Sequence, residues 1–180
     1  PLSSSGFFKT SKININTKTL KGRPFLNFAY GAAVSEVVVD TLTGENRLLQ
    51  VDIIHDVGNS INKRIDKGQI EGGFIQGLGW LTTEEISWKL DGKLQTHSPS
   101  TYKIPTSGET PFKLNVEIYN RGFNKEDVIN RSKAVGEPPF MLAISSFIAI
   151  KDAVYNANEN KDSLMLIAPA TPENILNSIN

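Results

Sequence analysis

The chain has 180 residues, with 19 basic and 19 acidic side chains, no cysteine and two histidines. The balanced charge argues against nucleic acid or an anionic membrane surface as the main partner. The lack of cysteine excludes disulfides, cysteine-ligated metals and iron–sulfur clusters in this chain. His55 and His97 lie far apart, and no ligand spacing indicates a metal site built by the protein. We find no signal peptide and no apolar run of membrane-spanning length, so we expect a soluble, cytoplasmic protein with no membrane partner.

The first 24 residues are rich in Ser, Lys and Asn, with apolar residues only at intervals. We predict that residues 1–24 form an extended, partly covered arm with little regular structure, and that residues 25–180 form the folded region. The chain begins at Pro1 within a Ser-rich stretch, which suggests a fragment or a processed product.

A β-hairpin is predicted next. The β-branched run 36–40 and the apolar run 48–54 flank a turn at Thr43–Asn46. The second run ends at His55, which could act as a ligand or an acid–base group. An ordinary hydrogen bond at the end of a strand is the simpler interpretation.

Residues 62–85 are predicted to form a helix because apolar residues recur at helical spacing. Five glycines interrupt this pattern, and each costs a helix about 1 kcal/mol relative to alanine. Gly73 and Gly77 share one face, so another helix or a flat ligand can approach closely; tight helix packing is the simpler explanation. The segment lacks the dinucleotide fingerprint. Gln69 and Gln76 have hydrogen-bonding reach, and each could face solvent or bind a cofactor.

The rest of the chain alternates turns with regular elements. Asp91–Gly92 predicts a hairpin turn, and residues 112–119 predict a strand. A helix that is apolar on nearly all sides, and therefore buried, is predicted from about Pro138 to Asn158. A short helix ends near Ile179. The fold class is therefore α+β, with antiparallel hairpins packed against buried helices.

Ser132–Pro139 (SKAVGEPP) places a carboxylate directly before a Pro-Pro pair. Proline is well tolerated in the first turn of a helix, so Glu137 is expected at the mouth of the helix that follows. The φ restraint of Pro138 holds it there, and Gly136 leaves the backbone open to a ligand. Glu137 is either a carboxylate held toward a cavity or a helix-capping residue.

Several stretches, in this order, resemble the C-terminal part of the molybdenum-binding subunit of the xanthine dehydrogenase and aldehyde oxidase family, with an ending like that of bacterial members. The resemblance covers essentially the whole chain, and the matching stretches are 56–58, 68–79, 83–85, 100–105, 132–139 and 168–173. One departure is Ser98, which stands where a glycine is common in the family.

The resemblance implies the C-terminal portion of a molybdopterin-binding domain, with Glu137 as the catalytic base and Gln69 as a residue that hydrogen-bonds the molybdopterin. It implies hydroxylation of xanthine or hypoxanthine to urate, with water as the oxygen source. The base takes the proton from the attacking hydroxyl, and electrons leave through 2Fe-2S clusters to FAD and NAD. The molybdenum would be held by the cofactor, so no metal-ligating residue is expected here.

The implied partners are the upstream part of the same subunit, the iron–sulfur and FAD subunit or domains, a purine substrate and other copies in an oligomer. The isolated chain is expected to fold without turnover. Other functions stay open: an aldehyde oxidase or another N-heterocycle hydroxylase of the same family, a non-catalytic assembly domain in which Glu137 is only a cap, or a glycine-loop nucleotide-binding module.

Overall fold

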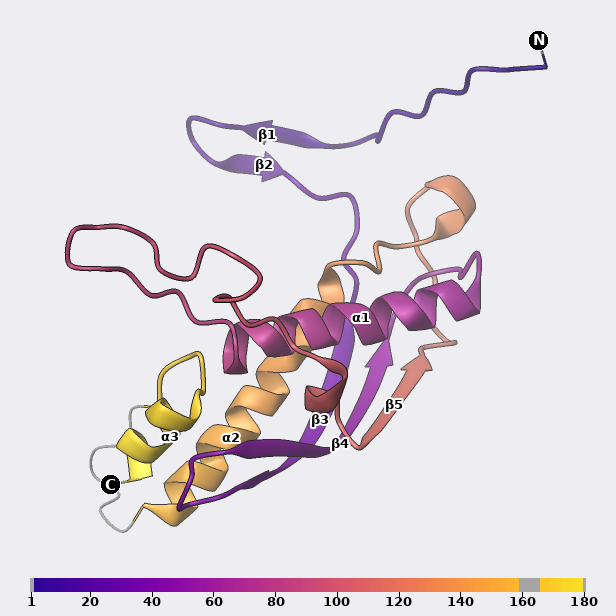
Figure 1. Ribbon diagram of the computed structural model, residues 1–180. Coiled ribbons are helices and arrows are strands. Elements are labelled where there is room, and N and C mark those ends of the chain that lie inside the picture. The colour runs from indigo at the N-terminus through magenta and orange to yellow at the C-terminus, as the bar shows by residue number, and fades with distance from the viewer. Residues whose placement is uncertain (1, 159–165, 180) are drawn as a thin grey trace.

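The computed structural model describes residues 2–158 and 166–179. Two long helices lie across one face of a three-stranded sheet, and an N-terminal arm extends away from them (Figure 1). The regular elements in chain order are β1 (Asn14–Asn16), β2 (Lys21–Arg23), β3 (Gly31–Val39), β4 (Asn46–His55), α1 (Lys63–Thr82), β5 (Lys113–Ile118), α2 (Ile144–Ala157) and α3 (Pro172–Ile179).

The main sheet has the order β3-β4-β5. β3 and β4 form the predicted antiparallel hairpin, from Gly31 opposite His55 to Val39 opposite Asn46. The strand predicted at 112–119 is also present as β5, but it pairs with β4 in parallel. A parallel pair requires a long crossover, and α1 with the loop that follows it provides one. The predicted α+β class is confirmed, although the parallel pairing of β4 with β5 was not expected from the sequence.

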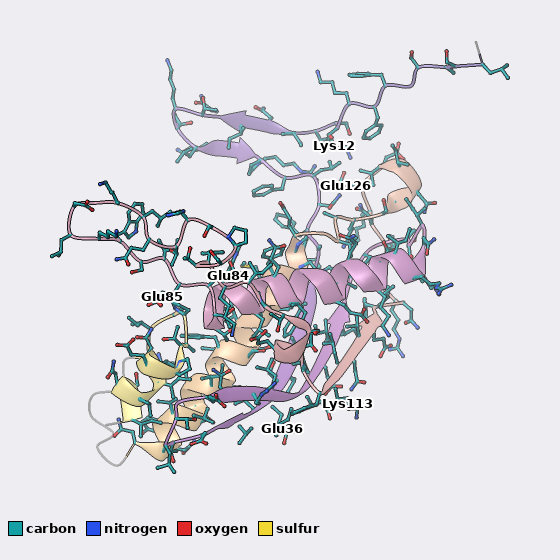
Figure 2. All side chains as sticks on the ribbon, viewed as in Figure 1. Lys12, Glu36, Glu84, Glu85, Lys113 and Glu126 are labelled. Carbon is teal, nitrogen blue, oxygen red and sulfur yellow. The ribbon has the colours of Figure 1, made fainter. Side chains whose placement is uncertain are left out.

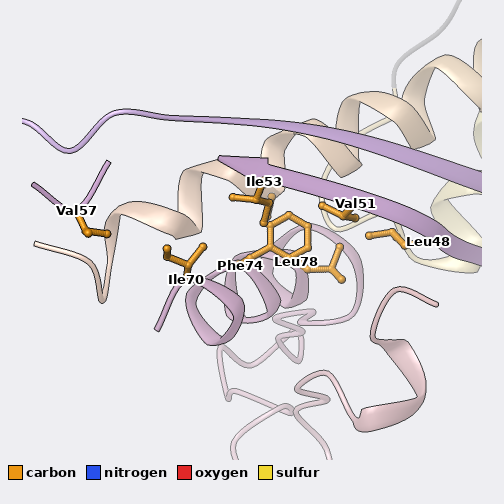
Figure 3. Close-up of a cluster of buried hydrophobic side chains, with 8 residues drawn as sticks. Leu48, Val51, Ile53, Val57, Ile70, Phe74 and Leu78 are labelled. Atoms are coloured by element: carbon orange, nitrogen blue, oxygen red, sulfur yellow. The ribbon is translucent and has the colours of Figure 1, made fainter. Parts of the chain in front are cut away.

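The core lies between β4 and α1. Val51 and Ile53 point from β4 toward Ile70, Phe74 and Leu78 of α1, and all five side chains are buried (Figure 3). The alternate residues of the strands, among them Asp52 and Glu117, are exposed on the other face. This alternation is typical of a sheet that packs on one side only.

The helix predicted over 62–85 is confirmed as α1. Asn62 caps it, its side-chain oxygen accepting hydrogen bonds from the backbone N–H groups of Arg64 and Ile65 at 3.1 and 3.3 Å. The helix ends at Thr82, and the long loop toward β5 follows it from about Glu84 (Figure 2).

The helix predicted from Pro138 has two parts, a 3₁₀ segment at Pro138–Ala143 and α2. The expectation that it is buried on all sides is wrong for this chain, because Met141, Ile144 and Ile148 are about half exposed. Pro138–Ala157 is also long and apolar enough to cross a membrane, so the expectation that no run reaches that length is wrong too. Core helices pass the same test, and this one packs on β3 and α1.

The N-terminal arm is exposed along its length, so it is not covered as expected. It contains a small hairpin of β1 and β2 that the sequence did not predict. Two ion pairs with Glu126 tie the arm to the body. Lys12 Nζ lies 3.0 Å from Glu126 Oε2 (Figure 2), and Arg23 lies 2.5 Å from Glu126 Oε1. The division at residue 24 stays a prediction.

The two smaller expected elements are present. At Asp91–Gly92 the chain turns, with the Gly92 N–H donating to the Lys89 carbonyl at 2.9 Å and Trp88 bridging to Leu94. The short C-terminal helix is α3, which begins at Pro172 and ends at Ile179. Its Ile175 packs with Ile150 and Val154 of α2.

Candidate functional site

The residues predicted to form a site come from two elements that lie against each other, α1 and the segment 131–140, here called the Glu137 segment. A Cβ atom added to Gly73 would lie 2.8 Å from the Gly136 carbonyl oxygen and 3.2 Å from Pro139 Cβ. A Cβ on Gly77 would lie 3.0 Å from Phe140 Cα. These two glycines therefore allow the chain to pack against itself, as the simpler interpretation held, and do not leave room for a flat ligand.

The glycines on the outer side of α1 have a different environment. Gly68 and Gly72 are exposed, and a Cβ at either position would meet nothing within 4 Å. Gln69 and Gln76 are exposed on the same helix, and neither side chain makes a hydrogen bond to another described residue. The result is an open helical face with two amide groups, which can donate to and accept from a polar, flat molecule.

Gln69 lies beside the segment that carries Glu137. A Cβ on Gly136 would lie 3.5 Å from Gln69 Oε1, so the amide reaches the backbone directly before Glu137. The structure thus brings together the two residues predicted for the site, although they are 68 positions apart in the chain. Gln76, about two helical turns along α1 from Gln69, is not placed at this contact by any described interaction.

Glu137 stands at the N-cap position of the 3₁₀ segment, as expected from the two prolines that follow it. Its side chain makes no capping hydrogen bond, so the interpretation of a helix-capping glutamate is not supported. Glu137 is exposed and has no ion-pair partner among the described residues. Its carboxylate is therefore free to act on a ligand.

Contacts on both sides fix the backbone that carries Glu137. Downstream, Pro139 is buried and the Phe140 ring lies 4.7 Å from the Trp80 ring of α1, centre to centre. Upstream, the Lys133 N–H donates to the Val57 carbonyl at 2.8 Å. The carboxylate thus sits on a segment held at two places, which is the preorganisation that a functional group requires.

His55 is the last residue of β4 and directly precedes Asp56, which pairs with Lys133 of the Glu137 segment. It is 1% exposed, and its Nδ1 has no hydrogen-bond partner among the described residues. Burial lowers the pKa of His55 below its usual value; nearby Asp56 acts in the opposite direction and Lys133 in the same direction. The imidazole is therefore neutral at pH 7 and is not an ordinary hydrogen-bonded histidine at a strand end.

Two of the motifs noted in the sequence meet at the C-terminal end of α1. The Tyr102 hydroxyl donates to Glu84 Oε2 at 2.5 Å, and this bond raises the pKa of Tyr102. Sequence reasoning missed this pair and also the buried ion pair of Lys133 with Asp56. All four residues lie in motifs that carry the family resemblance, but nothing in the sequence indicated which residues would pair.

Among the described residues, no group of three or more His, Cys, Asp or Glu side chains could hold a metal ion. A cofactor that carries its own metal is compatible with what the chain does offer, namely two unbonded amides and an open glycine face on α1. Gln69, on that face, lies beside Gly136, the residue directly before Glu137. Unbonded amides beside an exposed glycine face fit a large polar cofactor.

Comparison with known proteins identifies the family. A family model described as Molybdopterin cofactor-binding domain matches residues 1–111. Over 98% of its length the chain is 48% identical to the xanthine dehydrogenase/oxidase of Felis catus, and over 97% it is 42% identical to aldehyde oxidase 1 of Bos taurus. The crystal structure of quinoline 2-oxidoreductase from Pseudomonas putida 86 superposes with a TM-score of 0.70 and 28% identity, over 79% of this chain and 17% of that one.

The chain spans only 14% of the length of the cat protein and 13% of that of the bovine protein. The matched region includes the whole N-terminal arm, the hairpin of β3 and β4, and α1 with Gln69. The predicted molybdopterin cofactor is thereby confirmed, and the chain belongs to the molybdopterin cofactor-binding domain family.

Proposed function

We propose that the enzyme containing this chain is a molybdenum hydroxylase that oxidises xanthine and hypoxanthine to urate, with water as the source of oxygen. The similarity to a xanthine dehydrogenase/oxidase over 98% of the chain supports this substrate class. Within that enzyme, the chain is the part that carries the base and one cofactor contact.

Glu137 is proposed as the general base and Gln69 as a hydrogen-bonding residue of the molybdopterin. When bound, the molybdenum cofactor supplies the two-electron redox chemistry, and the protein supplies placement and proton transfer. Glu137, as a carboxylate with no partner in the described chain, can accept the proton of the attacking hydroxyl. Gln69 can donate its amide hydrogens to the cofactor beside it.

One observation carries this proposal. Glu137 has neither a capping bond nor an ion pair, yet its backbone is fixed on both sides and it lies next to Gln69. A general base must be held close to the proton it removes, and the fixed backbone around Glu137 meets this requirement.

The proposed partners follow from the same assignment. The upstream part of the same subunit would complete the site, and 2Fe-2S and FAD modules would carry the electrons away in a cytoplasmic, oligomeric enzyme. The half-exposed apolar side chains of Met141, Ile144 and Ile148 support a large covering partner, because burying the exposed half of each is worth roughly 0.7–1.5 kcal/mol.

Aldehyde oxidation is the second candidate, supported by the 42% identity to aldehyde oxidase 1 of Bos taurus. The residues of this chain do not separate the two substrates. A comparison of kcat/KM for xanthine and for an aromatic aldehyde, measured with the same enzyme preparation, decides between them.

The central test is Glu137→Gln in the enzyme that contains this chain. Loss of the base should lower kcat by about 10²–10⁴-fold while molybdenum and molybdopterin content stay unchanged. Glu36→Gln is the matched control, because Glu36 is exposed on β3, on the face of the sheet away from α1 (Figure 2). Native activity in a fully loaded Glu137→Gln enzyme would refute the assignment and favour an assembly role.

A further inference from the structure

The buried ion pair between Asp56 and Lys133 has no part in the function proposed so far. Lys133 Nζ lies 2.5 Å from Asp56 Oδ2, and the two side chains are 8% and 9% exposed. In every other ion pair among the described residues, at least one side chain is more than 40% exposed. A buried pair is costly to desolvate and is a weak source of stability, so its presence calls for another explanation.

Both charged groups have further partners that fix their positions. The other carboxylate oxygen of Asp56 accepts the Gly58 N–H at 2.8 Å, and the Asp56 N–H donates to the Tyr30 carbonyl at 2.8 Å. Lys133 Nζ lies 5.3 Å from the centre of the Tyr30 ring, within reach of a cation–π interaction. Because each group is held by several partners, the pair has one geometry.

The backbone beside the pair is joined in the same place. The Lys133 N–H donates to the Val57 carbonyl, and the Asn59 N–H donates to the Arg131 carbonyl at 3.1 Å. Gly58, between them, has a φ of +63°, and a Cβ there would lie 2.5 Å from the Arg131 carbonyl oxygen. The chain at 131–133 is thus attached to the end of β4 through both backbone and side chain.

Only residues 134–136 separate this attachment from Glu137. None of them makes a hydrogen bond to another described residue, but Val135 packs against the core and Gly136 lies against Gly73 of α1. On the other side of Glu137, Pro139 and Phe140 are held against α1. The position of Glu137 therefore depends on the packing of this segment against α1 and the core, and on the attachment at Lys133.

We propose that the Asp56–Lys133 pair is a positioning device for Glu137, which sets where the carboxylate stands relative to the cofactor and substrate. This inference rests on the proposed role of Glu137 as base. Neither Asp56 nor Lys133 contacts the reacting atoms. They act through the backbone of residues 134–136, and an error of about 1 Å in the position of the base is enough to cost up to about 100-fold in rate.

The test removes both charges together, as Asp56→Asn with Lys133→Met, so that no unpaired charge is left buried. It is made in the whole enzyme and again in the Glu137→Gln background, with steady-state kinetics on xanthine and assay of bound molybdopterin. The control is Lys103→Met with Glu109→Gln, which removes a more exposed ion pair on the loop before β5. If the double variant does not retain cofactor, Asp56→Asn with Lys133→Gln, which also removes both charges and keeps an acceptor for Gly58, is measured in its place.

The expected result is a fall in kcat of about 10–100-fold with KM changed by less than about threefold. In the Glu137→Gln background the same change should produce no additional loss, because the pair acts through a carboxylate that is no longer present. A fully loaded variant with native kcat overturns the inference, and so does an equal loss in both backgrounds. Native activity of the Glu137→Gln enzyme would instead refute the proposed role of Glu137 as base, and the present inference would fall with it.

Discussion

Gly73→Ala tests how closely α1 and the Glu137 segment pack. A Cβ at position 73 would lie 2.8 Å from the Gly136 carbonyl oxygen, where ordinary contact begins near 3.4 Å. The two backbones must therefore separate by roughly 0.6 Å, since neither Gly136 nor the ring of Pro139 can rotate away. Overpacking of this kind typically costs about 1–3 kcal/mol.

Gly72→Ala is the matched control, one residue away on the same helix. Position 72 is exposed, and a Cβ there would meet nothing within 4 Å. Both substitutions gain the same helix propensity, about 1 kcal/mol. The difference between the two variants therefore isolates the packing cost: Gly72→Ala should stabilise by about 1 kcal/mol, and Gly73→Ala should be about 1–3 kcal/mol less stable than Gly72→Ala.

The assay is urea unfolding of the purified chain, followed by circular dichroism, with the slope of the transition required to be equal for both variants. Equal free energies of unfolding for Gly72→Ala and Gly73→Ala would refute the close approach. In the whole enzyme, Gly73→Ala should also lower kcat, because the displaced residue, Gly136, directly precedes Glu137.

Three further predictions concern pH and isolation. Burial lowers the pKa of His55 in the folded state, so the stability that its neutral form contributes is complete above pH 6.5 and is lost as the pH falls. In thermal unfolding between pH 7.5 and 5.5, His55→Gln should therefore weaken the fall of stability with decreasing pH. An unchanged dependence of stability on pH would count against this prediction. Hydrogen bonds from Lys103 and Thr106 lower the pKa of Glu109 to about 2. The Glu109 carboxylate therefore contributes to the free energy of unfolding above pH 4.5, and this contribution is lost as the pH falls toward 2. At this partly exposed site it is about 1 kcal/mol or less. Glu109→Gln should therefore destabilise at pH 7 and progressively less below pH 4.5 in the same assay. The isolated chain should fold but give no xanthine-dependent reduction of a dye, and turnover would contradict the view that the rest of the site lies outside it.

Local patterns were enough to predict the elements that position the site. Apolar spacing predicted α1, the β-branched runs predicted the hairpin of β3 and β4, and the Pro-Pro pair predicted where Glu137 would stand. Each of these depends on residues close together in the chain, where the 3.6- and 2-residue periods and turn chemistry operate. The roles of Gln69 and Glu137 came from a family resemblance, and only the structure shows that Gln69 lies beside Gly136, the residue before Glu137.

Long-range pairing could not be predicted in the same way. Asp56 and Lys133 are 77 positions apart, and their contact depends on how the end of β4 meets the Glu137 segment. The five glycines of α1 read alike in the sequence, yet Gly73 packs against backbone and Gly72 faces open space. The parallel pairing of β5 likewise depends on the route of the crossover, which no local pattern specifies.

Glu137 has a restrained backbone and a carboxylate without a bonded partner among the described residues, and two conflicting requirements explain this combination. A base must be held in one place, and the usual way to hold a carboxylate is to bond it, as Glu109 is bonded by Lys103 and Thr106. Such bonds stabilise the anion and make it a weaker proton acceptor. This chain restrains the backbone on either side of Glu137 and leaves the carboxylate without a partner among the described residues. On the proposed assignment of Glu137 as the base, substitutions at the anchors should therefore change where Glu137 stands without removing its carboxylate.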